Sequence, residues 1–121
     1  MAERLVVHKY GGSSLADAEK ILNVACRIAK VKESGVDVVT VVSAMGDATD
    51  DLIQLAHTIA PEPDPRELDL LLSTGELVSC TLLSIALRTL GYDAISLSGV
   101  QAGIHTDTMY GKARINSIDP A

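Results

Sequence analysis

The chain has 121 residues, of which 47% are hydrophobic and 21% are charged, a balance typical of one globular domain rather than of a disordered segment. The net charge is −6, and the ten Lys and Arg residues form no run, which argues against a nucleic-acid partner because binding to phosphate backbones needs clustered positive charge. Aromatic residues make up only 2%, so stacking platforms for bases are nearly absent.

The N-terminal third reads as strand, helix, strand. Leu5–Val7 is short, apolar and β-branched, which predicts a buried strand. Residues 14–34 predict a helix, because apolar residues recur every three or four positions, Ser14 opens a capping-box-like start and Gly35 is placed to end it. Residues 38–42 (VVTVV) predict a second strand that is apolar on both faces, as parallel strands covered by helices are.

Two helical patterns follow. Residues 43–51 (SAMGDATDD) predict a loop that opens a helix, and the proline-rich residues 61–65 break that helix. Residues 65–90 predict a long helix with an Asp-Pro start and with Gly91 as its stop. Thr74–Gly75 interrupts its leucine-rich pattern and predicts a kink or a split in two.

The C-terminal part predicts two further strands, at residues 94–98 (AISLS) and 112–119 (KARINSID). Strand–helix–strand–helix–strand order indicates an α/β layer fold with a largely parallel sheet. The sequence stops without a terminal helix, so we expect a fold cut in its middle.

Cysteine content and targeting signals point to the cytoplasm. Cys26 and Cys80 lie in apolar, helix-like contexts without a Cys-x-x-Cys pair or a Cys/His cluster, which predicts buried free thiols and no zinc site. We find neither a signal-peptide pattern nor an apolar run of membrane-spanning length, so the sequence predicts a soluble cytoplasmic protein without a membrane partner.

The motif KYGGSS, Lys9 to Ser14, lies between a strand end and a helix start, where open α/β sheets place ligands. Glycines let a backbone approach an anion closely, a helix start presents free N–H groups, and a lysine adds a point charge, so a phosphate is the natural guest. The alternative is a tight turn with a capping serine. Ser43–Gly46 repeats the arrangement after the second strand, and Thr49 offers a hydroxyl or a simple cap in the next helical turn.

Two further polar features can be interpreted from their sequence context. Glu76 sits in a leucine-rich helical pattern, so it needs a cationic partner or a ligand amine unless it lies on a solvated face. His105 and Asp107 form a polar pair that we interpret as a surface feature at a strand end.

Five spaced motifs carry a family resemblance: KYGGSS, VVSAMGDATDDL, LLLSTGEL, SGVQAGIHTD and GKARI. Together they resemble the N-terminal part of the catalytic domain of aspartokinases, in the amino acid kinase superfamily, in family order from Leu5 to Ile115. The resemblance implies a three-layer αβα, carbamate kinase-like fold with a mainly parallel sheet, here incomplete. Residues 1–121 would form the substrate- and phosphate-binding half, without the nucleotide half and the regulatory domains.

The resemblance also implies a reaction, the phosphorylation of the L-aspartate side-chain carboxylate by ATP and Mg²⁺, the first step of lysine, threonine and methionine biosynthesis. Lys9 and Glu76 would be the catalytic residues, with Glu76 facing the α-ammonium of aspartate. The residues implied for ATP are Lys9, Tyr10, Gly11, Gly12, Ser13 and Ser43. Those implied for aspartate are Ser43, Asp47, Thr49 and Glu76, and no residue is implied as a metal ligand.

Ser13, where the family often has Thr, keeps the hydroxyl, and Val100 stands where a polar residue is common. Because the nucleotide half is absent from this sequence, we expect the chain to form a homo-oligomer or to associate with that half. We also expect the isolated chain to be inactive. Two alternatives stay open: a non-catalytic binding module on a half kinase fold, and another carboxylate kinase of the superfamily.

Overall fold

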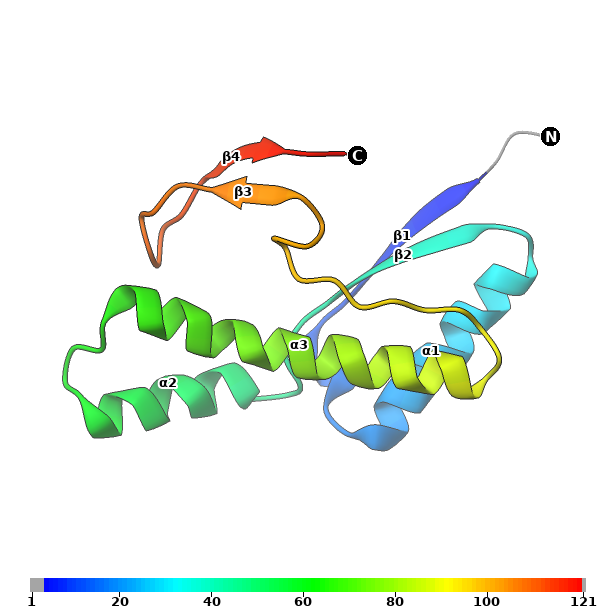
Figure 1. Ribbon diagram of the computed structural model, residues 1–121. Helices are drawn as coiled ribbons and strands as arrows, with labels where there is room; N and C mark the ends of the chain where they lie inside the picture. Colours follow the sequence, from blue (N-terminus) through cyan, green and yellow to red (C-terminus); the bar gives the residue numbers. More distant parts are fainter. Residues whose placement is uncertain (1–3, 121) are drawn as a thin grey trace.

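The computed structural model describes residues 4–120. Its elements are arranged as two separate two-stranded sheets with three long helices (Figure 1). In chain order they are β1 (Leu5–Tyr10), the 3-10 helix η1 (Gly12–Leu15), α1 (Ala18–Glu33), β2 (Asp37–Val42), α2 (Ala48–Ile59), α3 (Pro65–Thr89), β3 (Ile104–Thr106) and β4 (Ile115–Ile118).

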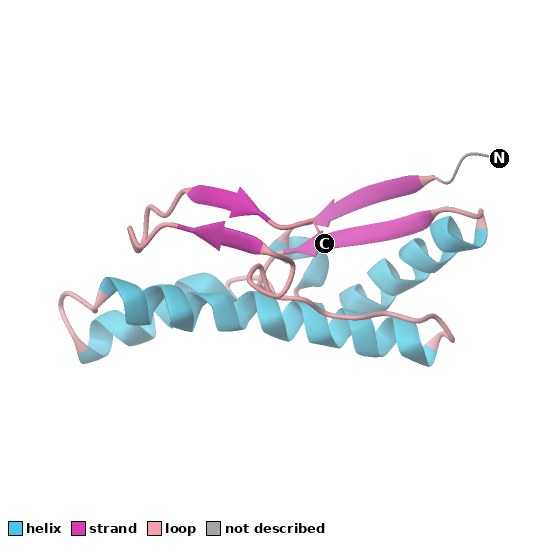
Figure 2. Cartoon of the chain, turned by 45° about the horizontal axis from the view of Figure 1, so that its top comes forward, coloured by secondary structure: helices cyan, strands magenta, loops and turns pink. Residues whose placement is uncertain are grey.

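The first sheet is a parallel pair in which Tyr10 of β1 lies opposite Val42 of β2. Figure 2 shows the three helices on one side of this pair. Alternate residues of both strands point to that side, because side chains in a strand alternate between its two faces. The outer face carries apolar side chains that remain between 48% and 64% exposed: Leu5, Val7, Val39 and Val41. The predicted α/β class with a parallel, incomplete sheet is confirmed, and the described residues supply a helical layer on one face only.

The start of α1 differs from the prediction by a few residues. Asp17 is the N-cap, and its side chain accepts a hydrogen bond from the Lys20 N–H at 2.9 Å, whereas Ser14 lies in η1. The predicted stop is confirmed, because Gly35 has φ +94°, in the left-handed region that favours glycine. The inner face of α1 forms most of the hydrophobic core, which contains Tyr10, Leu15, Ile21, Val24, Ala25, Ile28, Leu83 and Ala86.

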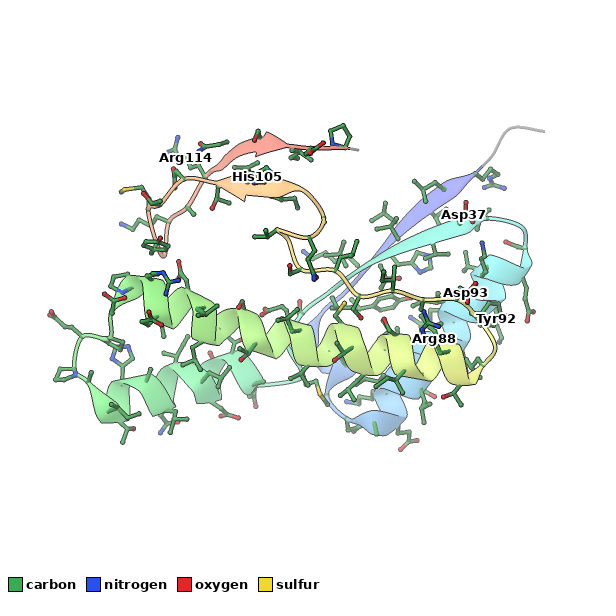
Figure 3. The ribbon with its side chains drawn as sticks, in the orientation of Figure 1. Asp37, Arg88, Tyr92, Asp93, His105 and Arg114 are labelled. Carbon is green, nitrogen blue, oxygen red and sulfur yellow. The ribbon has the colours of Figure 1, made fainter. Side chains whose placement is uncertain are left out.

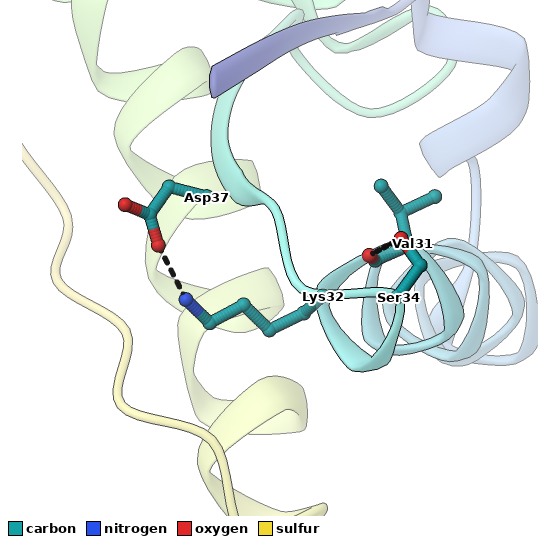
Figure 4. Close-up of polar contacts among 4 residues, drawn as sticks. All are labelled: Val31, Lys32, Ser34 and Asp37. Carbon is teal, nitrogen blue, oxygen red and sulfur yellow. Dashed lines mark hydrogen bonds and ion pairs between the residues drawn. The ribbon is translucent and has the colours of Figure 1, made fainter. Parts of the chain in front are cut away.

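Local polar contacts tie the end of α1 to the start of β2 (Figure 4). The Ser34 hydroxyl donates to the Val31 carbonyl, and the Lys32 ammonium pairs with the Asp37 carboxylate at 2.5 Å. Both members of the ion pair are largely exposed, so the pair adds little to stability. Cys26 is exposed and Cys80 is half-buried, so the prediction of a buried thiol is wrong for Cys26.

α3 is one uninterrupted helix of 25 residues, so the predicted split at Gly75 is wrong. Its predicted ends are confirmed: the Asp64 side chain accepts from the Glu67 N–H, and Gly91 has φ +92° beyond the last turn. Among the described residues, α3 is the single helix long and apolar enough to cross a membrane by length and composition alone. The expectation that no such stretch exists is therefore wrong, although α3 packs against both α1 and α2 here.

Ser79 of α3 is fully buried, and its hydroxyl has no hydrogen-bond partner among the described residues. A buried hydroxyl without a partner costs free energy, because it has lost its bonds to water. We therefore expect Ser79→Ala to raise the free energy of unfolding by about 1 kcal/mol, measured by urea denaturation of the 121-residue chain. Ser73→Ala, at an exposed position of the same helix, is the control. A lower free energy of unfolding for Ser79→Ala than for the unmodified chain would contradict the destabilising role of the Ser79 hydroxyl.

The C-terminal region departs most from the prediction. Residues 94–98 are extended but pair with no strand, so the predicted third strand is wrong in this structure. The predicted last strand exists as β4, but it pairs antiparallel with β3 and not with the main sheet. This hairpin is linked to α3 by a hydrogen bond from the Gly111 N–H to the Asp69 carboxylate at 2.7 Å.

Candidate functional site

Three segments that the sequence separates meet beside the parallel strands. The first is the loop Gly11–Ser14 that follows β1, the second is the loop Ser43–Asp47 that follows β2, and the third is the middle of α3 around Gly75. The loops follow the carboxyl ends of two parallel neighbours, which lie at the same edge of the sheet.

The two loops are joined by backbone hydrogen bonds. The Ser43 N–H donates to the Tyr10 carbonyl at 3.2 Å, and the Gly46 N–H donates to the Gly12 carbonyl at 2.9 Å. A Cβ atom at Gly12 would lie 2.8 Å from the Ala44 carbonyl oxygen and 3.0 Å from that of Gly46. The second glycine of the KYGGSS motif is therefore required for the close approach of the loops, a reason that the sequence does not disclose.

We expect Gly12→Ala to lower the free energy of unfolding of the 121-residue chain by about 1–3 kcal/mol, because two backbone carbonyls must move to admit the methyl group. Gly11→Ala is a matched control, since nothing lies within 4 Å of a Cβ at Gly11. Urea denaturation of both variants gives the comparison. Equal stabilities of the two variants would contradict the role of close packing at Gly12.

The second loop also packs against α3. Gly75 is buried, and a Cβ there would lie 3.0 Å from the Ala44 Cβ and 3.8 Å from a Leu52 methyl carbon. The glycine thus lets α3 approach the loop after β2, which explains its presence inside an otherwise regular helix. Thr74, the residue before Gly75, lines a cleft together with Met45 of the second loop.

A small cleft of about 300 Å³ lies between α2 and α3 at this point. Its wall includes Ala48 and Gly75, the sequence neighbours of the predicted aspartate ligands Thr49 and Glu76. The residues that line it are Met45, Ala48, Asp51, Leu52, Thr74, Gly75 and Val78. Sequence reasoning did not select Asp51 or Thr74, and no spacing signal distinguishes them from ordinary helix residues.

Four of the predicted polar residues lie on these three segments or directly beside them. Lys9 is exposed near the end of β1, Ser43 is half-buried after β2, Thr49 is half-buried in the first turn of α2, and Glu76 is exposed on α3. None of these four side chains forms a hydrogen bond or an ion pair with a residue that the structure describes. Glu76 therefore lies on a solvated face of α3, one of the alternatives that the sequence left open, and it forms no salt bridge with residues 4–120.

The remaining predicted residues differ in their environment. Asp47 is the N-cap of α2, but its side chain makes no capping bond. Ser13 and Gly11 are exposed on the first loop. Tyr10 is 7% exposed with its ring in the core, so any contact with a nucleotide would come from its main chain.

The Tyr10 hydroxyl lies 3.0 Å from the Nδ1 atom of His8, and the two rings meet edge to face. Burial raises the pKa of the Tyr10 phenol above its usual value, and the positive charge of Arg27 partly opposes this shift. The phenol therefore stays protonated at neutral pH. His8 and Tyr10 lie on the inner face of β1, whereas Lys9, between them in the sequence, lies on its exposed face.

The polar pair near the C-terminus is a local structural feature. His105 is exposed on β3, and the Asp107 carboxylate accepts from the N–H groups of Met109 and Arg114 across the turn of the hairpin. Figure 3 shows His105 and Arg114 on the hairpin, away from the parallel strands. Our interpretation of this pair as a surface feature agrees with the structure.

Comparisons with known proteins show which proteins this chain is similar to. Residues 4–120 match the model of the amino acid kinase family. The chain is 53% identical over 116 residues to an aspartokinase of Mycolicibacterium smegmatis, and 52% identical over 115 residues to aspartokinase 2 of Bacillus subtilis. These alignments cover 96% and 95% of this chain but 28% of each relative. The crystal structure of an aspartate kinase from Synechocystis superposes with a TM-score of 0.79 at 52% identity, over 83% of this chain and 17% of that one.

Proposed function

The chain belongs to the amino acid kinase family, and on this premise we propose that it is the N-terminal, substrate- and phosphate-binding part of an aspartokinase. The complete enzyme would transfer the γ-phosphoryl group of ATP to the side-chain carboxylate of L-aspartate. The observation that carries the proposal is the meeting of three motif segments whose polar side chains Lys9, Ser43, Thr49 and Glu76 bind no described residue of the protein.

The chemistry of phosphoryl transfer suits such an arrangement. The protein needs to position two anionic reactants and stabilise the charge on the transferred group, and it supplies little covalent chemistry. We assign to the Lys9 ammonium the stabilisation of that charge, and to the first loop the binding of ATP phosphates. The glycines of this loop would let its backbone approach a phosphate closely.

Aspartate would bind between the second loop and α3. The Glu76 carboxylate would pair with its α-ammonium group, while the hydroxyls of Ser43 and Thr49 would donate to its carboxylates. Asp47, in the same loop as Ser43, would contact aspartate through its ammonium group or through a water molecule. This division of roles leaves the acid of α3 to recognise the substrate and the lysine of β1 to act on the reacting group.

ATP would bring Mg²⁺ with it. No group of three His, Cys, Asp or Glu side chains suited to a metal ion lies among residues 4–120. The metal would therefore be held mainly by phosphate oxygens and water, as is usual for Mg²⁺ in kinases. When bound, it would neutralise phosphate charge. We place the complete enzyme in the cytoplasm, with the part outside this chain or a second subunit as its partner.

The test uses a chimeric kinase, defined as this chain followed by the part of the M. smegmatis aspartokinase that lies beyond its matched segment. We expect aspartate-dependent ADP release from the chimeric kinase and none from the 121-residue chain alone, because this chain spans 28% of the relative. A coupled ADP assay measures both. Turnover by the 121-residue chain alone would contradict the proposal that it is one part of the enzyme. A folded chimeric kinase that phosphorylates another carboxylate in place of aspartate would contradict the proposed substrate.

A further inference from the structure

The chain that follows α3 turns back and runs along the same helix. Figure 2 shows β3 and β4 on the side of the helices where β1 and β2 also lie. Hydrogen bonds fix this returning chain to α3 at two places, one in the C-terminal half of the helix and one near its N-terminus. The chain between the two places, residues 97–110, therefore bridges the middle of the helix.

The first anchor is formed by polar groups around residues 94–96. The Ser96 hydroxyl donates to the Cys80 carbonyl at 3.1 Å, so the proton between the Ser84 and Ser96 hydroxyls, which lie 2.7 Å apart, comes from Ser84. The Arg88 guanidinium donates to the Ala94 carbonyl at 2.9 Å. These bonds hold the start of the bridging chain to the C-terminal half of α3.

The second anchor is a contact at the tip of the hairpin. The Asp69 carboxylate accepts a hydrogen bond from the Gly111 N–H at 2.7 Å, within the range of charge-assisted bonds. Asp69 is half-buried, and neither of the two ion pairs in the described part of the chain includes it. The Asp107 carboxylate supports the turn from inside, because it accepts from the Met109 and Arg114 N–H groups. The turn thus has its own support, and Asp69 links it to α3.

Glu76 lies between the two anchors on the same face of α3. It follows Asp69 by seven residues, which is almost two helical turns and about 10 Å along the axis. Cys80 of the first anchor lies one turn further on, at about 6 Å. Leu83, seven residues beyond Glu76, is buried in the core with Tyr10 of β1, so this face points toward the parallel strands. Glu76 itself is exposed, so the bridging chain leaves its carboxylate open.

We propose that Asp69 is a positioning residue of the kinase, which holds the hairpin at Gly111 so that residues 97–110 cover the aspartate bound to Glu76. The inference rests on the proposed function, in which the Glu76 carboxylate pairs with the substrate ammonium. Asp69 lies about 10 Å from Glu76 along the helix, so it would not touch the substrate itself. It would act by holding the cover in place, so that this chain need not be ordered each time aspartate binds.

This role predicts which kinetic constant changes. A preformed cover tightens the binding of substrate and transition state alike, so its loss raises KM and leaves kcat nearly unchanged. In the chimeric kinase we expect Asp69→Ala to raise the KM for aspartate about tenfold, with less than about threefold change in kcat and in the KM for ATP. Asp69→Asn keeps an oxygen that can accept from the Gly111 N–H, so its aspartate KM should lie within about threefold of that of the unmodified chimeric kinase.

Glu67→Ala is the matched control for these kinetics. Glu67 is an exposed acid two residues before Asp69, a rotation of about 200° around the helix, so it points away from the hairpin. Its kinetic constants should match those of the unmodified chimeric kinase. A hairpin that only stabilises the fold predicts instead a lower Tm for Asp69→Ala with an unchanged aspartate KM, and that result would overturn the proposal. An Asp69→Asn enzyme as impaired as Asp69→Ala would also overturn it.

Hydrogen exchange in the 121-residue chain tests the anchor without reference to activity. The Gly111 amide should exchange about tenfold faster in Asp69→Ala than in the unmodified chain, and at close to the unmodified rate in Asp69→Asn. The Lys112 amide, which donates to the Met109 carbonyl within the turn, is the internal control. Equal exchange of the Gly111 amide in the unmodified chain and in Asp69→Ala would show that the anchor does not form.

These measurements separate the role of Asp69 from the proposed function. A chimeric kinase that phosphorylates another acid refutes aspartate as the substrate, and the KM for that acid then reports on Asp69. A chimeric kinase that binds aspartate without phosphorylating it refutes the proposed function, and calorimetry of aspartate binding then replaces KM as the readout. A released Gly111 amide with an unchanged aspartate KM in an active chimeric kinase refutes the cover alone.

Discussion

Lys9→Ala should lower the kcat of the chimeric kinase by about 100- to 1,000-fold, while the KM for aspartate changes by less than about threefold. Lys9 is exposed at the end of β1 and has no ion-pair partner among the described residues, so its ammonium is available to a ligand. An interaction that strengthens as charge develops on the transferred group lowers the barrier more than it tightens substrate binding. Steady-state kinetics with aspartate varied at saturating ATP measure both constants.

The control for this experiment is Lys30→Ala, which removes an exposed lysine from the last turns of α1 without touching either loop. We expect its kcat to match that of the unmodified chimeric kinase. A Lys9→Ala enzyme with kcat within threefold of the parent would remove Lys9 from the chemical step. A large rise in the KM for ATP with unchanged kcat would assign the residue to ground-state binding of the nucleotide instead.

Glu76→Gln should raise the KM for aspartate by roughly tenfold or more, on the scale of about 1.5–3 kcal/mol for a hydrogen bond to a charged group. The substitution keeps the shape of the side chain and removes the charge that would face the substrate ammonium. The KM for ATP should change little. Because Glu76 is exposed and makes no bond to a described residue, the Tm should also stay unchanged.

Glu67→Gln is the matched control for this variant, since it removes an exposed acid from the first turn of the same helix, away from the loops. Its surface ion pair with Arg66 contributes little to stability. We expect normal kinetic constants for Glu67→Gln. An unchanged aspartate KM in Glu76→Gln would rule out the recognition role of Glu76, whatever the effect on stability.

The start of α3 and the ends of α1 and α3 were predictable because their determinants are local. An Asp-Pro pair starts α3, and Gly35 and Gly91 adopt the positive φ that their positions after a helix require. Residues 94–98 were mispredicted for the opposite reason. Their pattern is that of a strand, but a strand forms only when another strand pairs with it, and no strand among residues 4–120 pairs with them.

The same contrast between local and long-range determinants holds for the candidate site. Its motifs were visible as strand-end loops rich in glycine and serine, and the structure brings these loops together. The role of Gly75 was not visible, because it depends on the distance from α3 to Ala44, which is remote in the sequence. A glycine that permits helix contact and a glycine that breaks a helix have the same signature in one sequence.

The outer face of the parallel strands has a consequence for how the protein is made. In a kinase as long as the M. smegmatis relative, roughly 300 residues remain to be synthesised after this segment, which takes a ribosome about 15–60 s. Throughout that interval, Leu5, Val7, Val39 and Val41 stay in contact with solvent beside an unpaired strand edge. Exposed hydrophobic surface and unpaired strand edges make incompletely folded chains prone to aggregation, so in the proposed complete kinase this segment would need chaperone protection until later residues cover it.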